Sequence, residues 1–210
     1  VAQLLLRMYE ATHGSIEMEG VDIRKIDLPT LRKQISYVPQ DVFLFSDTVA
    51  GNISFGVNEV TKTEILEAAR QSSVHHDISG FEKNYDAQIG ERGVTLSGGQ
   101  KQRISIARAL MKDPGLVIFD DCLSAVDTRT EKEIIGNLYD YLESKTAIII
   151  THRVFSLFHF DKIVVIEDGE IIEEGTHEEL LQLNGYYTDL YIRQQQVEAR
   201  PEGNGAKMAD

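Results

Sequence analysis

The sequence predicts an α/β fold whose mostly parallel sheet is interrupted by an inserted helical subdomain. Residues 116–119, Thr146–Ile150 and residues 162–166 are short, rich in β-branched side chains and almost wholly apolar, which is typical of parallel strands buried on both faces. An amphipathic helix is expected at Thr128–Leu142, between the first two runs, and strands that alternate with helices indicate βαβ units. Residues 41–111, in contrast, show helical patterns and little strand signal.

The first forty residues predict a helix and two strand regions. Residues 2–11 place apolar side chains at helical spacing, and no capping residue precedes them, so the helix is expected to begin at or before the first residue of the chain. Residues 15–23 alternate polar and apolar positions, which predicts strand and turn. Residues 35–38 predict a short strand that ends at Pro39, because proline cannot donate to a sheet ladder.

Local signals also set further helices and one hairpin. The spacing Thr-x-x-Glu occurs at residues 61–64 and 176–179 and is that of a capping box, in which each side chain bonds the other residue's backbone N–H. Asp168-Gly169 predicts a tight hairpin turn between two apolar strands. Residues 186–197 predict a last helix, and a polar tail follows from residue 199.

Composition narrows the class of protein. The chain has 210 residues, of which 42% are hydrophobic and 26% charged, and its formal net charge is −13. A nucleic-acid binder usually carries a basic face, so DNA or RNA is not expected as a partner. The single cysteine, Cys122, excludes an intrachain disulfide and fits a reducing compartment. No apolar stretch of the sequence approaches the roughly 18 residues of a membrane span.

The strongest functional signal is LSGGQKQRISIARAL, residues 96–110. Ser97 and Gln100 fit a capping box, so a helix should begin at Gly98 and Gly99. Glycine has no Cβ, which lets backbone N–H groups approach an anion, and a helix N-terminus adds partial positive charge. The segment therefore predicts a phosphate-binding turn, although a glycine-rich loop with a helix cap would fit its first residues alone.

A second signal is LVIFDDCLSAVD, residues 116–127. Its apolar strand ends in Asp120 and Asp121, at the carboxyl edge where open α/β sheets bind ligands. Taken alone, the two carboxylates would also suit a turn or a helix cap. Together with residues 96–110 they resemble ATP-binding-cassette (ABC) proteins, in which LSGGQ, residues 96–100, is the signature motif.

The resemblance extends over residues 1–193 and implies roles for single residues. Asp120 matches the aspartate that holds Mg²⁺, and Asp121 matches the residue that polarises the attacking water. Gln40 matches a glutamine that contacts Mg²⁺, His152 a histidine that contacts the γ-phosphate, and Asp127 a loop that meets the opposite subunit. The implied catalytic residues are Asp121, His152 and Gln40, the implied metal ligands Asp120 and Gln40, and the implied nucleotide-binding residues Leu96, Ser97, Gly98, Gly99, Gln100 and Asp127.

The family also implies an architecture, cofactors and a partner. A P-loop NTPase-like core is expected at residues 1–40 and 112–193, the helical subdomain with the signature motif at 41–111, and a disordered tail at 194–210. ATP and Mg²⁺ are the implied cofactors. ATP is expected to lie between this domain and a second nucleotide-binding domain, in a homodimer or a heterodimer.

Three segments resemble ABC exporters in particular, namely residues 36–53, 91–100 and 167–181. In exporters, the positions of Glu91-Arg92 and of the region after Gln40 meet the coupling helices of a transmembrane domain. The apolar pair Phe43 and Phe45 suits such a contact, although ordinary core of the helical subdomain is the alternative for both. The implied function is ATP hydrolysis that energises an exporter from the cytoplasmic face of the membrane. A soluble ABC ATPase and a regulatory ATP-binding module with little turnover are the alternatives.

The sequence departs from the family at two points. It contains no G-x-x-x-x-G-K-[ST] phosphate loop, which in the family lies directly before a helix like residues 2–10, so this chain alone is expected to have negligible ATPase activity. Asp121 stands where the family has glutamate, and a carboxylate misplaced by about 1 Å can cost on the order of 100-fold in rate. A heterodimer would explain a slow site beside an intact signature motif, and a homodimer of slow sites is the competing explanation.

Overall fold

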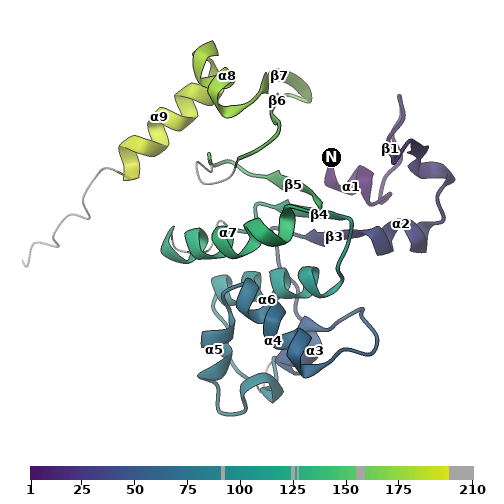
Figure 1. Cartoon of the computed structure of the whole chain (residues 1–210), viewed down its shortest axis with the longest axis vertical. Coiled ribbons are helices and arrows are strands. Elements are labelled where there is room, and N and C mark those ends of the chain that lie inside the picture. Colours follow the sequence, from purple (N-terminus) through teal and green to yellow (C-terminus); the bar gives the residue numbers. More distant parts are fainter. Residues whose placement is uncertain (91–92, 124–125, 127, 155–158, 199–210) are drawn as a thin grey trace, which may run out of the picture. The chain divides into compact units, whose positions relative to one another are not determined.

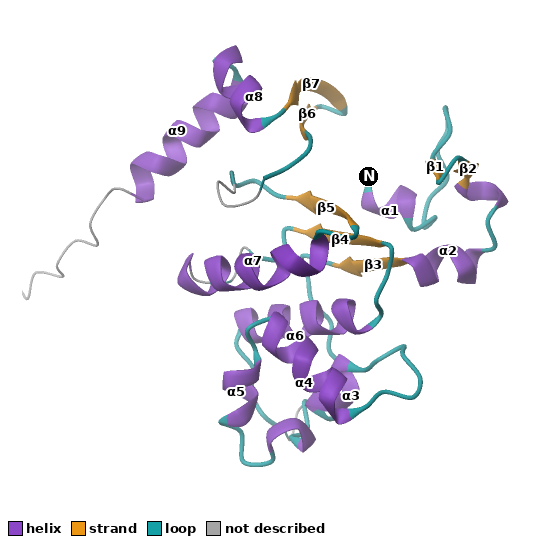
Figure 2. Ribbon diagram, viewed as in Figure 1, coloured by secondary structure: helices purple, strands orange, loops and turns teal. Residues whose placement is uncertain are grey.

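The computed structural model describes residues 1–90, 93–123, 126, 128–154 and 159–198. The chain divides into two compact units, Val1–Ile150 and Thr151–Asp210. Figure 1 follows the chain through both units, and Figure 2 distinguishes their helices from their strands.

The first unit alternates helices with short strands. Its elements in chain order are α1 (Ala2–Leu5), β1 (Glu17–Met18), β2 (Val21–Asp22), the 3-10 helix η1 (Ile23–Lys25), α2 (Leu28–Gln34), β3 (Ile35–Val38), α3 (Val49–Ile53), α4 (Lys62–Gln71), α5 (His75–Ser79), the 3-10 helix η2 (Asn84–Asp86), α6 (Gly98–Met111), β4 (Leu116–Asp120), α7 (Thr128–Leu142) and β5 (Thr146–Ile150).

A parallel sheet in the order β3-β4-β5 organises the first unit (Figure 2). Val38 pairs with Phe119 and Asp120 pairs with Ile150, so the strands end at a common edge. The parallel pairing confirms the predicted βαβ unit, because α7 connects β4 to β5. β4 is the middle strand, and its residues 116–119 are buried, as expected for a strand covered on both faces.

The prediction of burial on both faces is wrong for β5. Thr146 and Ala147 are exposed, and the three isoleucines that follow are only half-buried. Both β3 and β5 are outer strands of the described sheet, but β3 is largely buried whereas β5 is not. An apolar β-branched run therefore indicated a strand correctly but did not reveal its place in the sheet.

The first helix is shorter than the predicted helix at residues 2–11. α1 ends at Leu5, and Arg7 has a left-handed backbone with φ of 47°. The Arg7 guanidinium donates to the carbonyl oxygens of Ile23 at 3.1 Å and Ile26 at 2.8 Å. Contacts with the segment after β2 thus fix the chain in a turn where local spacing favoured further helix.

The segment between β3 and β4 consists of helices joined by loops, and its longest helix, α6, packs on the sheet. The hydroxyl of Ser36 on β3 donates to the carbonyl oxygen of Ala109 at 3.0 Å, and both residues are buried. Ile104 and Ile106 of α6 are fully buried, and α3 and α4 both pack against this helix. The division of the chain at residues 40, 111 and 193 stays a prediction.

The second unit contains a hairpin and two helices, β6 (Ile163–Glu167), β7 (Glu170–Gly175), α8 (His177–Leu183) and α9 (Tyr186–Glu198). The predicted turn is confirmed, since Asp168 and Gly169 have φ of 49° and 86°, the left-handed pair of a type I′ turn. The run at 162–166 is not a parallel buried strand, however, because β6 pairs antiparallel with β7 and Ile166 is 53% exposed.

Helix α9 extends past residue 194, where the tail was expected to begin. α9 continues to Glu198, and Gln194 explains part of this extension. Its amide accepts from the backbone N–H of Val154 and donates to the carbonyl oxygen of Val154, both at 2.9 Å. Two hydrogen bonds to one buried backbone position hold the end of α9 in place.

Candidate functional site

The signature motif forms the N-terminus of α6, as predicted. Ser97 is the N-cap, and its Oγ accepts from the backbone N–H of Gln100 at 3.2 Å, while Gln100 Oε1 accepts from the backbone N–H of Ser97 at 3.0 Å. Leu96 is buried, whereas Ser97 and Gly98 are exposed. The first N–H groups of a helix have no partner within it, so this exposed turn can bind an anion.

The two aspartates lie at the carboxyl edge of the sheet, and Gln40 joins them there. Gln40 follows β3, and its Nε2 donates to Asp121 Oδ2 at 3.1 Å. Asp121 has a left-handed backbone with φ of 45°, and its N–H donates to the carbonyl oxygen of Ile150 at 2.8 Å. The structure therefore brings together Asp120, Asp121 and Gln40 from two adjacent strand ends.

Tyr37 is a site residue that the sequence reasoning missed. It lies on β3, and its hydroxyl donates to Asp120 Oδ2 at 2.8 Å. Burial raises the pKa of Tyr37 to about 12, and the bond to the Asp120 carboxylate adds to this shift. The hydroxyl is therefore a protonated donor at neutral pH. Only the pairing of β3 with β4 could have indicated this contact, and sequence spacing does not show which strands pair.

The oxygen atoms at this edge suit Mg²⁺ together with a nucleotide. Within the described residues no three His, Cys, Asp or Glu side chains are grouped to hold a metal ion. Asp120 and Gln40 offer carboxylate and amide oxygens, and Mg²⁺ is usually held by one or two carboxylates plus substrate phosphates and water. These few protein oxygens suit a metal ion that is also held by a nucleotide. They suit a metal ion held by the protein alone less well.

Four predicted residues are not placed at this edge by the described structure. His152 lies in the second unit, two residues after the end of β5. Asp127 and the pair Glu91-Arg92 lie outside the described residues. The roles of all of them stay predictions.

Cys122 directly follows the aspartates and is packed inside. Its side chain is buried, and burial is the main cause that raises the pKa of its thiol to about 12. A thiol reacts as the thiolate, so this cysteine is unreactive at neutral pH. It fits the interpretation of a small residue packed after the strand.

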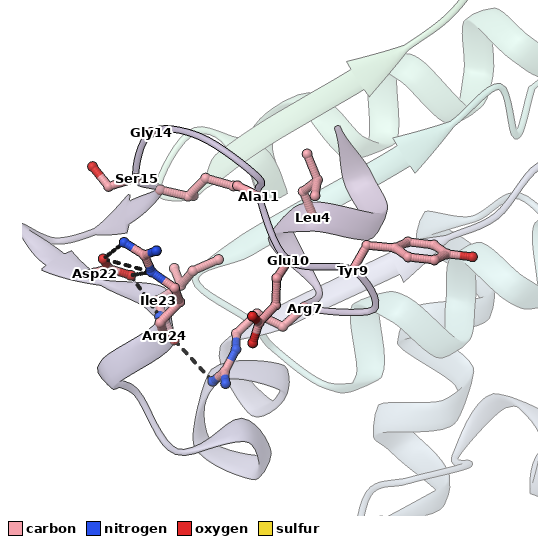
Figure 3. A pocket seen from close by; sticks show the side chains of 11 residues that line it. Leu4, Arg7, Tyr9, Glu10, Ala11, Gly14, Ser15, Asp22, Ile23 and Arg24 are labelled. Carbon is pink, nitrogen blue, oxygen red and sulfur yellow. Dashed lines mark hydrogen bonds and ion pairs between the residues drawn. The ribbon is translucent and has the colours of Figure 1, made fainter.

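A separate pocket lies between α1 and the β1–β2 hairpin and contains none of the predicted site residues (Figure 3). Three of its charged side chains, Arg7, Asp22 and Arg24, form contacts within the protein. Arg24 pairs with Asp22 at 2.6 Å, and Arg7 donates to the carbonyl oxygens of Ile23 and Ile26. The Arg7 contacts connect the segment after α1 to the segment after β2, which explains the pocket as part of the fold.

An exposed aromatic group follows Gln40 along the chain. Phe43 is 68% exposed and Phe55 is 54% exposed, and the rings of Phe45 and Phe55 stack with centroids 4.1 Å apart. Arg108 lies over these two rings, and its Nε donates to the carbonyl oxygen of Asn52 at 2.8 Å. Arg108 of α6 therefore holds the aromatic surface in place.

Comparisons with known proteins identify a family and individual relatives. The family described as "ABC transporter" matches residues 1–124, more than half of the chain. The chain is 47% identical over 206 residues to a probable multidrug resistance ABC transporter ATP-binding/permease protein, YheI, of Bacillus subtilis, covering 98% of this chain and 35% of the relative. It is 43% identical over 195 residues to an ATP-dependent lipid A-core flippase of Legionella pneumophila, covering 93% of this chain and 33% of the relative.

A solved structure agrees with these relatives. A bacterial Atm1-family ABC exporter with ATP bound matches with a TM-score of 0.87 and 38% identity, over 92% of this chain and 34% of the exporter chain. In the described part of this chain, no helix is long and apolar enough to cross a membrane. The matched family, the identity to its members and the shared fold all agree, and the chain belongs to the ABC transporter family.

Proposed function

We propose that this chain is the ATP-binding and ATP-hydrolysing part of a membrane exporter. The observation that carries the proposal is the signature motif, whose capped and exposed helix N-terminus suits a phosphate group. The chain spans about a third of each relative, 35% and 33% of their lengths, and the names of these relatives describe a multidrug transporter and a flippase. We expect the rest of such a protein to include the membrane-spanning part.

The signature motif is proposed to bind the γ-phosphate of a nucleotide held by a second nucleotide-binding domain. Ser97 Oγ accepts from Gln100, which leaves its O–H to donate to a phosphate oxygen. The backbone N–H groups of Gly98 and Gly99 belong to the first turn of α6, where N–H groups have no partner within the helix. The helix dipole favours negative charge at this end. ATP would thus be held between two domains and would draw them together.

The edge of the sheet is proposed to be this chain's own hydrolytic site. Asp121 would accept a proton from the attacking water, and Gln40 holds the Asp121 carboxylate at 3.1 Å. Asp120 and Gln40 would hold Mg²⁺, which neutralises phosphate charge when bound. Tyr37 fixes one oxygen of Asp120, so the direction of the other oxygen is set before the nucleotide arrives. His152 is proposed to contact the γ-phosphate.

This site is proposed to be slow, and the complex to be a heterodimer. Aspartate at position 121 is one methylene shorter than the glutamate expected there, and its backbone is held by the hydrogen bond to Ile150. The signature motif, in contrast, has its full set of residues. One chain can therefore complete a fast site on its partner while its own site turns over slowly.

The aromatic group at Phe43, Phe45 and Phe55 is proposed to meet the coupling helices of the transmembrane domain. Two of its rings are more than half exposed, and exposed apolar surface of this kind often marks an interface. Arg108 connects this surface to α6, the helix that begins with the signature motif. In the proposed exporter, the chain would lie at the cytoplasmic face of the membrane.

A matched pair of N-cap substitutions in the intact exporter tests the proposal. Ser97→Ala and Thr61→Ala each remove the side chain of an N-cap in a capping box, and each should cost about 1 kcal/mol of stability. Only Ser97→Ala should strongly lower ATP hydrolysis, because only that hydroxyl lies in the phosphate-binding turn. If both variants keep the wild-type rate of hydrolysis, the proposed function is wrong.

A further inference from the structure

The start of α6 is held from the side by an acidic residue on α5. Both oxygens of Asp77 accept from α6, Oδ1 from Gln100 Nε2 and Oδ2 from Arg103 NH1, each at 2.8 Å. The two helices lie close to one another in the helical segment (Figure 1). Asp77 is therefore bonded to the last residue of the signature motif without belonging to the motif.

Gln100 uses the two ends of its amide for two different partners. Its Oε1 accepts from the backbone N–H of Ser97 at 3.0 Å, and its Nε2 donates to Asp77. A continuous chain of hydrogen bonds thus runs from the backbone of Ser97 to Asp77. It fixes the orientation of the amide, because an exchange of its oxygen and nitrogen would place donor against donor and acceptor against acceptor.

The other capping boxes show why an amide is needed here. In α4 and α8 the equivalent residue is a glutamate, Glu64 or Glu179. A glutamate at position 100 could close the capping box equally well, but it would place a second carboxylate against Asp77. Glutamine at this position is thus explained by its lateral partner rather than by helix capping.

Arg103, in the next turn of α6, strengthens the contact between Asp77 and this helix. Its NH1 also donates to the carbonyl oxygen of Ser73 at 2.6 Å, and its Nε to that of Gly99 at 3.3 Å. The side chains of Arg103 and Asp77 are only 14% and 25% exposed. An ion pair this sheltered from water is less screened than a surface pair, so it can hold α6 in one position.

We propose that Asp77 is a positioning residue for the signature motif. It acts through Gln100 and Arg103 to set the direction of the first N–H groups of α6, and it does not itself touch the phosphate. The inference rests on the proposed phosphate-binding role of that turn. A shift of about 1 Å in such a group can lower a rate on the order of 100-fold, so Asp77→Ala should strongly impair hydrolysis.

An exchange of partners tests this role in the intact exporter. Gln100→Glu keeps the capping box but sets a carboxylate against Asp77, and we expect it to lower kcat/KM for ATP about 10-fold. Adding Asp77→Asn supplies an amide donor to that new carboxylate, and the double variant should recover to within about 3-fold of wild type. Asp113→Asn is the control, since Asp113 is 79% exposed and pairs with Lys145 away from the motif.

Two readouts separate positioning from general stability. The free energy of unfolding without nucleotide reports the loss of the ion pair, whereas kcat/KM reports the geometry of the motif. Recovery of kcat/KM in the double variant, without recovery of the unfolding free energy, supports positioning. A Gln100→Glu variant with the wild-type kcat/KM, or a double variant no better than that single variant, overturns it.

The Ser97→Ala variant distinguishes this proposal from the proposed function. If Ser97→Ala abolishes hydrolysis while the exchange of Asp77 and Gln100 has no effect, the motif binds phosphate but Asp77 does not position it. If Ser97→Ala itself leaves hydrolysis unchanged, the phosphate-binding role fails, and the positioning role fails with it.

Discussion

Asp121→Glu should accelerate ATP hydrolysis at the site formed by Asp120 and Asp121. The backbone at Asp121 is fixed by its bond to the carbonyl oxygen of Ile150 at 2.8 Å, so the reach of the carboxylate depends on side-chain length. One added methylene moves it outward by roughly 1 Å or more, and a correction of that size is worth up to about 100-fold in rate. This corresponds to about 2.7 kcal/mol of the activation barrier.

The same substitution carries a small cost in stability. Residue 121 has φ of 45°, and aspartate is among the residues that tolerate this left-handed region better than most. We therefore expect the glutamate variant to be about 1 kcal/mol less stable although it is faster. A gain in rate with a loss in stability would separate the catalytic effect from better folding.

The assay is single-turnover hydrolysis of Mg·ATP with the intact exporter in excess over the nucleotide. Asp41→Glu is the matched control, because Asp41 is an exposed aspartate next to Gln40 and undergoes the same chemical change. The control should keep the wild-type rate. An unchanged or lower rate for Asp121→Glu would refute the idea that carboxylate length limits this site.

Two further predictions follow from side-chain contacts. Tyr37→Phe removes only the hydroxyl that holds Asp120, so about 10-fold more Mg²⁺ should be needed for half-maximal nucleotide binding. Tyr141→Phe is the control, because it removes the hydroxyl of another half-buried tyrosine, and it should leave the Mg²⁺ requirement unchanged. The side-chain hydrogen bond from Arg24 holds the pKa of Asp22 at about 2, below its ordinary value of 3.8. The resulting stabilisation is present above pH 3.8 and is lost as the pH falls through 2. In acid unfolding, the Asp22→Asn variant should therefore lose less stability than wild type between these pH values. Parallel curves of stability against pH for the two proteins would contradict this.

Local signals in the sequence predicted local structure well. The capping boxes at residues 61–64, 97–100 and 176–179 are all present, because a cap depends on side chains three residues apart. The turn at Asp168-Gly169 was predictable for the same reason. The position of the signature motif at the start of α6 needed only this short-range chemistry.

Contacts between distant segments could not be predicted from spacing. Tyr37 reaches Asp120 across two strands whose pairing is not encoded in either strand alone. Arg7 turns the chain at the end of α1 because its partners lie beyond β2. The same limit applies to Asp77, since nothing in its own segment shows that it will lie beside Gln100.

The exposure of the strands was also beyond the sequence patterns. The apolar runs of β4 and β5 look alike, but the central strand β4 is buried, whereas β5 is largely uncovered, unlike the other outer strand β3. Hydrophobic content indicates that a strand can be buried, whereas the neighbours it acquires decide whether it is. The candidate site lies at the ends of these strands, so its residues were easier to predict than its surroundings.

The most direct test of the account compares two variants of the intact exporter by steady-state ATP hydrolysis. Ser97→Ala disables the signature motif that is proposed to complete the partner's fast site, and Asp120→Asn disables this chain's own slow site. We predict that Ser97→Ala removes most of the hydrolysis and that Asp120→Asn removes only a small part of it. Equal losses in the two variants, or a larger loss with Asp120→Asn, would contradict the account.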